Sequence, residues 1–170
     1  MARRRLAGSF SGSRALTMLR LAPLDAAPID VLCELFNDAR VRKHMPLARA
    51  VVDSDWVHDW ITGKQQLWPD ASFGPWSVWH ADDCIGWAGV QPNDESTNEL
   101  AVVLRHESWG LGTDVARLVM DRWNELGDTR PVLIFLPRSR GVGALQRRYG
   151  WERLADSTVD GITFATFRLQ

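Results

Sequence analysis

The most informative segment of the sequence is residues 99–113, which read Glu99-Leu-Ala-Val-Val-Leu-Arg-His-Glu-Ser-Trp-Gly-Leu-Gly-Thr113. The alternation from Asn98 to Arg105 predicts a strand, and Thr113 to Leu126 has the apolar spacing of an amphipathic helix. Gly110 and Gly112 lie between them, where glycine lets a backbone turn tightly and approach a ligand closely. Free amides at the helix start, together with the helix dipole, would form an anion-binding site there.

The spacing of these glycines differs from that of two well-known phosphate-binding loops. No Lys-Ser or Lys-Thr pair follows them as in a nucleotide P-loop. The third glycine and the ribose-binding acid of the dinucleotide fingerprint are also missing. Taken alone, a Gly-X-Gly pair at a helix start is as consistent with simple turn chemistry as with an anion site.

The rest of the chain alternates between strand and helix patterns. Strands are predicted at residues 17–21, 76–80, 85–90, 98–105, 131–136, 152–155 and 162–169. Helices are predicted from Pro28 after an Asp25 cap, from Asp53 or Ser54, over 113–126 and over 144–149. This order favours an α+β fold in which helices flank a mixed, mainly antiparallel central sheet.

Bulk composition excludes several classes of protein. A length of 170 residues with 45% hydrophobic and 24% charged residues is typical of one globular domain. A net charge of −1 and the lack of a long apolar run argue against nucleic-acid and membrane partners. Cys33 and Cys84 form no metal-binding pattern, so we expect reduced, buried thiols in a cytoplasmic protein.

The first 17 residues differ in composition from the remainder of the chain. They contain four arginines, several glycines and serines and no acidic residue. Without an apolar segment the stretch is no secretory signal, although a transit peptide or a basic arm has a similar composition. We expect a disordered, dispensable basic leader at 1–17 and a folded domain at 18–170.

Tryptophan is unusually frequent, with nine residues against a single tyrosine. Six of the nine lie between Trp56 and Trp87. A large apolar ring is usually part of a core, which is the preferred interpretation. The alternative is that a subset lines an apolar ligand pocket.

Four segments together resemble the GNAT superfamily of N-acetyltransferases. The phrase from Leu104 to Gly112 is similar to the "WGxG" form of the branch that includes ribosomal-protein N-terminal acetyltransferases. Leu19–Asp25 resembles the opening strand of the family, Ile85–Val90 its "IGxxGL" strand and Leu145–Trp151 the end of its last helix. The resemblance extends from Leu19 to Leu169 and is more specific than any single segment.

This resemblance implies an acetyl-CoA-dependent transfer of an acetyl group to a primary amine, by direct attack and without a metal. The acceptor would be a protein N-terminus or a small molecule. The glycine segment would hold the pyrophosphate of CoA. The expected CoA-binding residues are Val103, Leu104, Glu107, Trp109, Gly110, Leu111, Gly112, Thr113 and Ser139.

The chain departs from the family pattern at several positions. Glu107 is an acid where the family has a polar or basic residue, and Asp114 would repel a pyrophosphate unless it points away. Val142 replaces a usual pantetheine contact, and Gln146 stands where many relatives carry an acidic tyrosine. Tyr149 lies one turn away and is expected to pack in the core.

Glu99 is the first candidate for the catalytic base. It begins the strand that leads to the glycine segment, where the resemblance implies a carboxylate acting through water. A solvated charge at a strand end is the alternative. His44, just before Pro46, is the second candidate base, while His58 and His80 are expected to be structural.

A basic cluster contains Arg138, Arg140, Arg147 and Arg148. It is interpreted either as a phosphate partner for CoA or as a solvated helix face. Two other functions stay open: an acyl-CoA-binding regulatory module without turnover, and a ribosome or nucleic-acid partner that uses the leader. The sequence also leaves a homodimer open.

Overall fold

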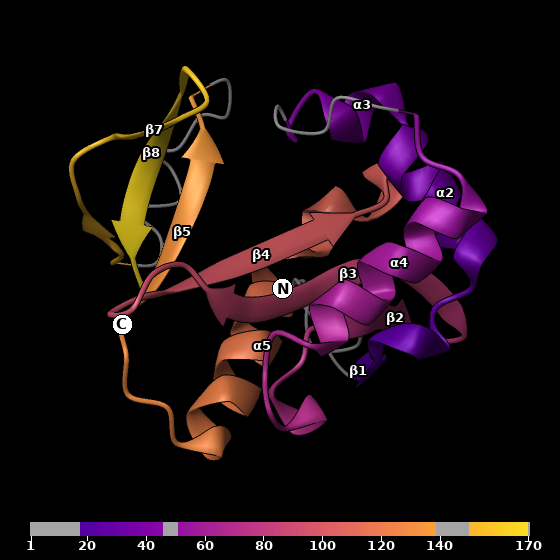
Figure 1. The fold of residues 1–170 in the computed structure, drawn as a ribbon, viewed down its shortest axis with the longest axis horizontal. Helices are drawn as coiled ribbons and strands as arrows, with labels where there is room; N and C mark the ends of the chain where they lie inside the picture. Colours follow the sequence, from indigo (N-terminus) through magenta and orange to yellow (C-terminus); the bar gives the residue numbers. More distant parts are fainter. Residues whose placement is uncertain (1–17, 46–50, 139–149, 170) are drawn as a thin grey trace, which may run out of the picture.

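The computed structural model describes residues 18–45, 51–138 and 150–169 (Figure 1). The expected leader and the expected helix at 144–149 lie outside the described residues. The same holds for several singled-out positions, namely Ser139, Arg140, Val142, Gln146, Arg147, Arg148 and Tyr149.

One sheet forms the centre of the molecule, with the strand order β1-β2-β3-β4-β5-β8-β6 and with β7 paired to β8. Its strands are β1 Leu19–Pro23, β2 Trp76–His80, β3 Asp83–Pro92, β4 Asn98–Leu104, β5 Val132–Pro137, β6 Glu152–Arg153, β7 Ser157–Val159 and β8 Ile162–Arg168. Within the described residues every neighbouring pair is antiparallel except β4 with β5. The predicted mixed, mainly antiparallel sheet is confirmed.

The two parallel strands stay together only at their beginning. Asn98 pairs with Val132 and Glu99 with Leu133, and no further pair follows along these described strands. Beyond this point β4 continues beside β3, while β5 continues beside β8, so the strands diverge (Figure 1). The sheet therefore opens between β4 and β5, starting at Glu99.

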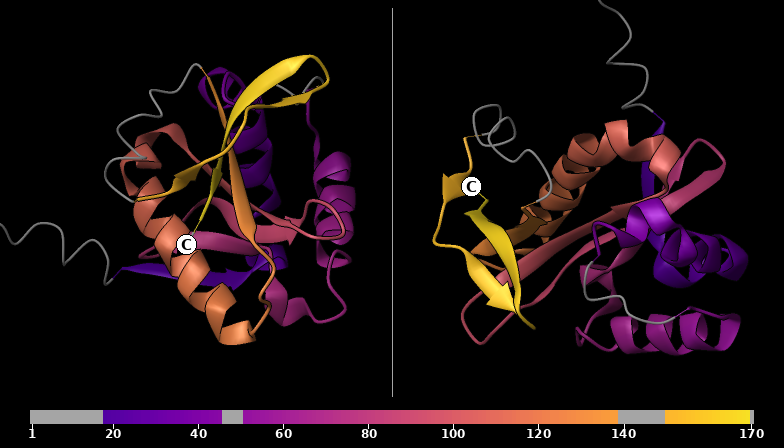
Figure 2. Two further views of the ribbon diagram at one scale, coloured as in Figure 1. Left: turned by 90° about the vertical axis from the view of Figure 1, so that its left-hand side faces the viewer. Right: turned by 90° about the horizontal axis from the view of Figure 1, so that it is seen from above.

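Helices cover both faces of the sheet. Their bounds are α2 Ile29–Asn37, α3 Ala39–Arg42, α4 Ser54–Gln65 and α5 Gly112–Leu126. Figure 2 shows α5 on one side of the central strands and α2 and α4 on the other. Because successive strand residues point to opposite faces, Ala88 packs in the cluster that contains α5, and Trp87 packs in the cluster that contains α2 and α4.

The helix ends agree with the sequence with one exception. The side chain of Asp53 caps α4 by accepting a hydrogen bond from the amide of Trp56 at 2.9 Å, as predicted. Helix α5 ends at Leu126, the predicted last residue, and Gly127 follows it with a φ of +81°. The prediction that Asp25 caps the first helix is wrong, because Asp25 lies in a 3-10 turn and Pro28 is the residue before α2.

The tryptophans divide between core and surface. Trp76, Trp87 and Trp123 are buried, whereas Trp56 is 43% exposed. Cys84 is buried and Cys33 is partly buried, and both are free thiols. Within the described parts of the chain, no helix combines the length and the apolarity that crossing a membrane requires.

Candidate active site

A cavity of about 980 Å³ opens where β4 leaves β5. Its walls come from α2, α4, β3, β4, β5 and the start of α5. Leu100 and Val102 line it from the α5 face of β4, and Ala101 and Val103 from the α2–α4 face. The cavity therefore reaches both faces of the sheet through the gap. Its volume lies at the upper end of the range of about 300–1,000 Å³ that is typical of small-molecule sites.

The segment between β4 and α5 is wound into a 3-10 helix, η3 His106–Leu111, where the sequence predicted a loop. The indole Nε1 of Trp109 donates a hydrogen bond to the carbonyl oxygen of Leu104 at 3.1 Å. The amide of Gly112 donates to the carbonyl oxygen of Trp109. These two bonds hold the end of β4 against the beginning of α5.

The structure places the expected CoA-binding residues in two groups. Five of them line the cavity, namely Val103, Leu104, Trp109, Gly112 and Thr113. Glu107, Gly110 and Leu111 are not among its lining residues. The first amides of an α-helix have no carbonyl partner within the helix and can bind an anion. The amide of Gly112 is already bonded to Trp109, so the amides that follow it in the first turn of α5 are the candidates for this role.

The structure agrees with one part of the role expected for these two glycines, the close approach of a ligand, and not with the other, a tight turn. Gly112 has a φ of −54°, and neither Gly110 nor Gly112 has a positive φ. The backbone conformation therefore does not require glycine at either position. A Cβ placed on either residue would meet nothing within 4 Å, so both leave open space beside the backbone.

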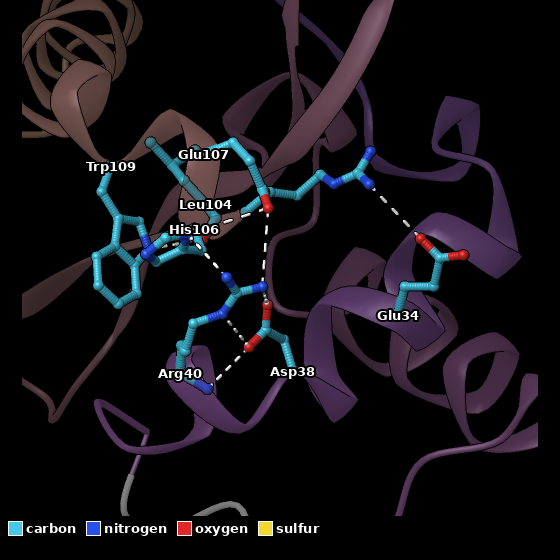
Figure 3. A network of polar contacts seen from close by, with 8 residues as sticks. Glu34, Asp38, Arg40, Leu104, His106, Glu107 and Trp109 are labelled. Atoms are coloured by element: carbon cyan, nitrogen blue, oxygen red, sulfur yellow. Dashed lines mark hydrogen bonds and ion pairs between the residues drawn. The ribbon is translucent and has the colours of Figure 1, made fainter.

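Glu107 is part of a network that joins α3 to η3 (Figure 3). The guanidinium of Arg40 lies 2.7 Å from Oδ2 of Asp38 and 3.7 Å from Oε1 of Glu107, and it donates to Nδ1 of His106 at 3.1 Å. Arg40 holds the pKa of Asp38 at about 2 by hydrogen bonding to its carboxylate. The acid that departs from the family pattern thus lies opposite a cation of this chain.

Two further charged positions have partners within the protein. Asp114, in the first turn of α5, lies 3.7 Å from the guanidinium of Arg117. Arg138 bonds to the carboxylate of Asp156, so this member of the basic cluster is already paired with an acid.

Glu99 lies in the cavity at the point where β4 and β5 separate. Its Oε2 accepts a hydrogen bond from Nε2 of Gln91 at 3.1 Å, and Nζ of Lys64 donates to Oε1 of the same amide. Burial raises the pKa of Glu99, while the bond from Gln91 and the charge of Lys64 oppose that rise. Burial also lowers the pKa of Lys64, against the attraction of Glu99.

Lys64 and Gln91 are site residues that sequence reasoning missed. Lys64 stands four residues after Trp60, and Trp60 four after Trp56, so all three share one face of α4. That spacing could have predicted that Lys64 lies on the same face of the helix as the two tryptophans. Gln91 faces Glu99 only because of the pairing of β3 with β4, and a single strand does not show its register.

His44, the second candidate base, lines the same cavity. Its ring lies 5.1 Å from that of Trp109 in an edge-on arrangement. The structure thus brings both candidate bases to one cavity. Among the described residues, no group of three or more His, Cys, Asp or Glu side chains is placed to hold a metal ion.

Comparisons with known proteins agree with this architecture. The chain matches the family described as "Acetyltransferase (GNAT) domain" over residues 17–152. No curated protein sequence matches the chain.

Several solved structures share the fold. A probable GNAT-family acetyltransferase from Chromobacterium violaceum is 20% identical, with a TM-score of 0.67 over 89% of this chain and 85% of that one. An acetyltransferase from Agrobacterium tumefaciens is 19% identical, with a TM-score of 0.68 over 99% of both chains. RimL, a ribosomal L7/L12 alpha-N-protein acetyltransferase in complex with coenzyme A, is 15% identical, with a TM-score of 0.71 over 89% and 93%.

Proposed function

This chain belongs to the acetyltransferase (GNAT) family, and we propose that it transfers an acetyl group from acetyl-CoA to a primary amine. One observation in the structure supports this reaction in addition to the family membership. A carboxylate whose pKa is raised by burial, Glu99, lies in a large cavity at the point where two parallel strands separate. An amine acetyltransferase needs a base at the place where its two substrates meet.

The open gap between β4 and β5 suits the donor. The pantetheine arm of acetyl-CoA carries amide groups, and strand edges offer backbone donors and acceptors that need partners. The edge of β4 that faces the gap has no strand partner among the described residues from Leu100 onward. The open space beside Gly112 and the first turn of α5 suits a phosphate group. The solved RimL structure holds coenzyme A on a similar fold.

The reaction needs a neutral amine, because an ammonium ion has no free electron pair. Glu99 takes a proton from the incoming ammonium, and its raised pKa makes it a stronger base than a solvated carboxylate. The amine nitrogen then attacks the thioester carbonyl carbon, and a C–N bond forms while the C–S bond breaks. The CoA thiolate leaves and takes up the proton released by the amide nitrogen. His44, in the same cavity, is the second candidate for the proton acceptor.

Release of free CoA thiol from acetyl-CoA in the presence of a panel of primary amines tests this function. We expect amine-dependent thiol release, together with an amine product heavier by one acetyl group in mass spectrometry. Calorimetry with acetyl-CoA runs in parallel. Tight binding without thiol release for any small amine or peptide would favour the acyl-CoA-binding regulatory module instead.

A further inference from the structure

Four aromatic side chains form a continuous strip along one wall of the cavity: Phe36, Trp56, Trp60 and Trp87. Trp56 and Trp60 are stacked, with centroids 6.2 Å apart and an interplanar angle of 13°. Phe36 lies edge-on to both, at 5.5 and 4.9 Å. Trp60 is in turn edge-on to Trp87 at 5.1 Å. Each ring therefore touches the next one along the wall.

The strip runs from solvent toward Lys64, which is linked to the candidate base Glu99 through Gln91. Trp56 is 43% exposed, Trp60 is partly buried and Trp87 is only 5% exposed. The ammonium of Lys64 lies 5.4 Å from the ring centroid of Trp87 and bonds to Gln91, the residue that contacts Glu99. Trp56 contacts Phe36 and Trp60 but belongs to neither hydrophobic core cluster of the described residues. An exposed indole in the lining of a cavity is typical of a surface that contacts a ligand.

The charged side chains in the cavity lining restrict the kind of amine that the cavity can accept. Among the described residues that line the cavity, Glu99 is the only carboxylate and Lys64 the only lysine or arginine. One carboxylate suits an acceptor with one ammonium group. A polyamine or an aminoglycoside would bring further positive charges, which find no acid in this part of the lining and are repelled by Lys64.

We infer that the acceptor is a primary amine carried on a flat aromatic ring, with the ring against the strip and the amine directed toward Glu99. The inference rests on the proposed function, because Glu99 serves as the base in both. Aromatic rings prefer edge-on or offset contact with other rings, and such contacts add to the burial of apolar area. Recognition of the ring would therefore depend on Trp56 and Trp60.

Steady-state acetylation of tryptamine, 2-phenylethylamine, 2-cyclohexylethylamine, spermidine and a short peptide tests the inference. The cyclohexyl compound matches the phenyl compound in size but lacks a flat π face. We expect tryptamine and 2-phenylethylamine to have the highest kcat/KM. Trp56→Ala should lower these two values by about tenfold and change the value for spermidine little. Trp79→Ala is the matched control, because Trp79 lies outside the cavity lining and faces Arg20.

Calorimetry of tryptamine binding in the presence of CoA keeps this inference separate from the proposed function. Tryptamine binding that Trp56→Ala weakens supports the assigned ligand class even if no acetyl group is transferred. Acetylation in which spermidine, the peptide or the cyclohexyl amine is preferred overturns the inference and leaves the transferase function intact. Unchanged tryptamine kinetics and binding in a folded Trp56→Ala variant overturn it as well. Thermal melting of each variant verifies the fold.

Discussion

Gln91 and Glu99 face each other across the antiparallel pair of β3 and β4, and Nε2 of Gln91 donates to Oε2 of Glu99 at 3.1 Å. Lys64 donates to the other end of the same amide, Oε1 of Gln91. Because an ammonium group can only donate, Oε1 must face Lys64 and the amide nitrogen must face Glu99. Lys64 therefore fixes the orientation of Gln91 and keeps a hydrogen-bond donor on the carboxylate of Glu99.

Lys64→Met should shift the acid limb of the pH–rate profile to higher pH. The substitution removes a positive charge and the group that orients Gln91, and both stabilise the ionised form of Glu99. The pKa of Glu99 rises, so the base is protonated, and activity is lost, at a higher pH than in the wild type. A profile of kcat/KM against pH for one accepted amine measures the shift.

Lys64→Arg is the control, since it retains the charge and the donor. Its acid limb should stay close to that of the wild type. If Lys64→Met lowers the rate by the same factor at every pH, then Lys64 has only a packing role and the orientation argument fails.

Glu99→Gln should stabilise the protein at neutral pH. The pKa of Glu99 is raised in the folded state, so folding favours its protonated form. The wild type then loses stability as the pH rises from the unfolded value of about 4.3 through the higher folded value. Glutamine carries no charge and avoids that loss.

Thermal melting of the two proteins across this pH window measures the effect. The melting temperature of Glu99→Gln should exceed that of the wild type above the folded pKa, and the gap should close below pH ~4. Glu95→Gln, in the exposed turn between β3 and β4, is the control for loss of a charge. A difference in melting temperature that is constant over the whole pH range would mean that ionisation of the buried Glu99 carboxylate does not destabilise the folded protein.

Gly112→Val should weaken acetyl-CoA binding by at least about tenfold, equivalent to about 1.4 kcal/mol. The new side chain would occupy the open space beside the first turn of α5, where we place the phosphates. Because an added Cβ would meet nothing within 4 Å beyond its chain neighbours and the backbone of its own helix, and φ is −54°, the fold should tolerate the change.

Gly63→Val is a matched control for this variant. Gly63 also lies in a helix with nothing within 4 Å of an added Cβ, but it is not part of the cavity lining. Calorimetry on both variants should show normal affinity for Gly63→Val alone. Normal affinity in a folded Gly112→Val variant would place the phosphates elsewhere.

The correct predictions rested on regular apolar spacing within one segment of the sequence. Most of the features that the sequence did not predict depend on contacts between distant segments. The apolar spacing of Val115, Val119 and Trp123 identified α5 because one helix face packs on the sheet. The divergence of β4 from β5, which creates the cavity, depends on two strands at once and is not visible in either one.

One missed element had a clear signal in the sequence. Asp160 and Gly161 both have positive φ and connect β7 to β8 in a tight hairpin, and an Asp-Gly pair between apolar residues is a strong hairpin pattern. Strand β7 was nevertheless absent from the predicted order. At Gly112 only the expected tight turn was wrong, because φ there is −54° and the open space beside the backbone agrees with close approach of a ligand.

Glu99→Gln should lower turnover by at least about 10²-fold at neutral pH, the contribution typical of a general base. Glutamine keeps the shape of the side chain and its contact with Gln91, so affinity for acetyl-CoA should change little. Raising the pH should partly restore the rate, since a larger fraction of the amine is then neutral in solution before it binds. This recovery distinguishes loss of a base from loss of structure, because a misfolded variant gains nothing from neutral amine.

The measurement is a pH–rate profile of both proteins with one accepted amine, with His44→Gln as the parallel variant. Equal rates for wild type and Glu99→Gln across the profile would remove Glu99 from the mechanism. A large loss in His44→Gln, in the same cavity, would then assign the proton acceptor to His44.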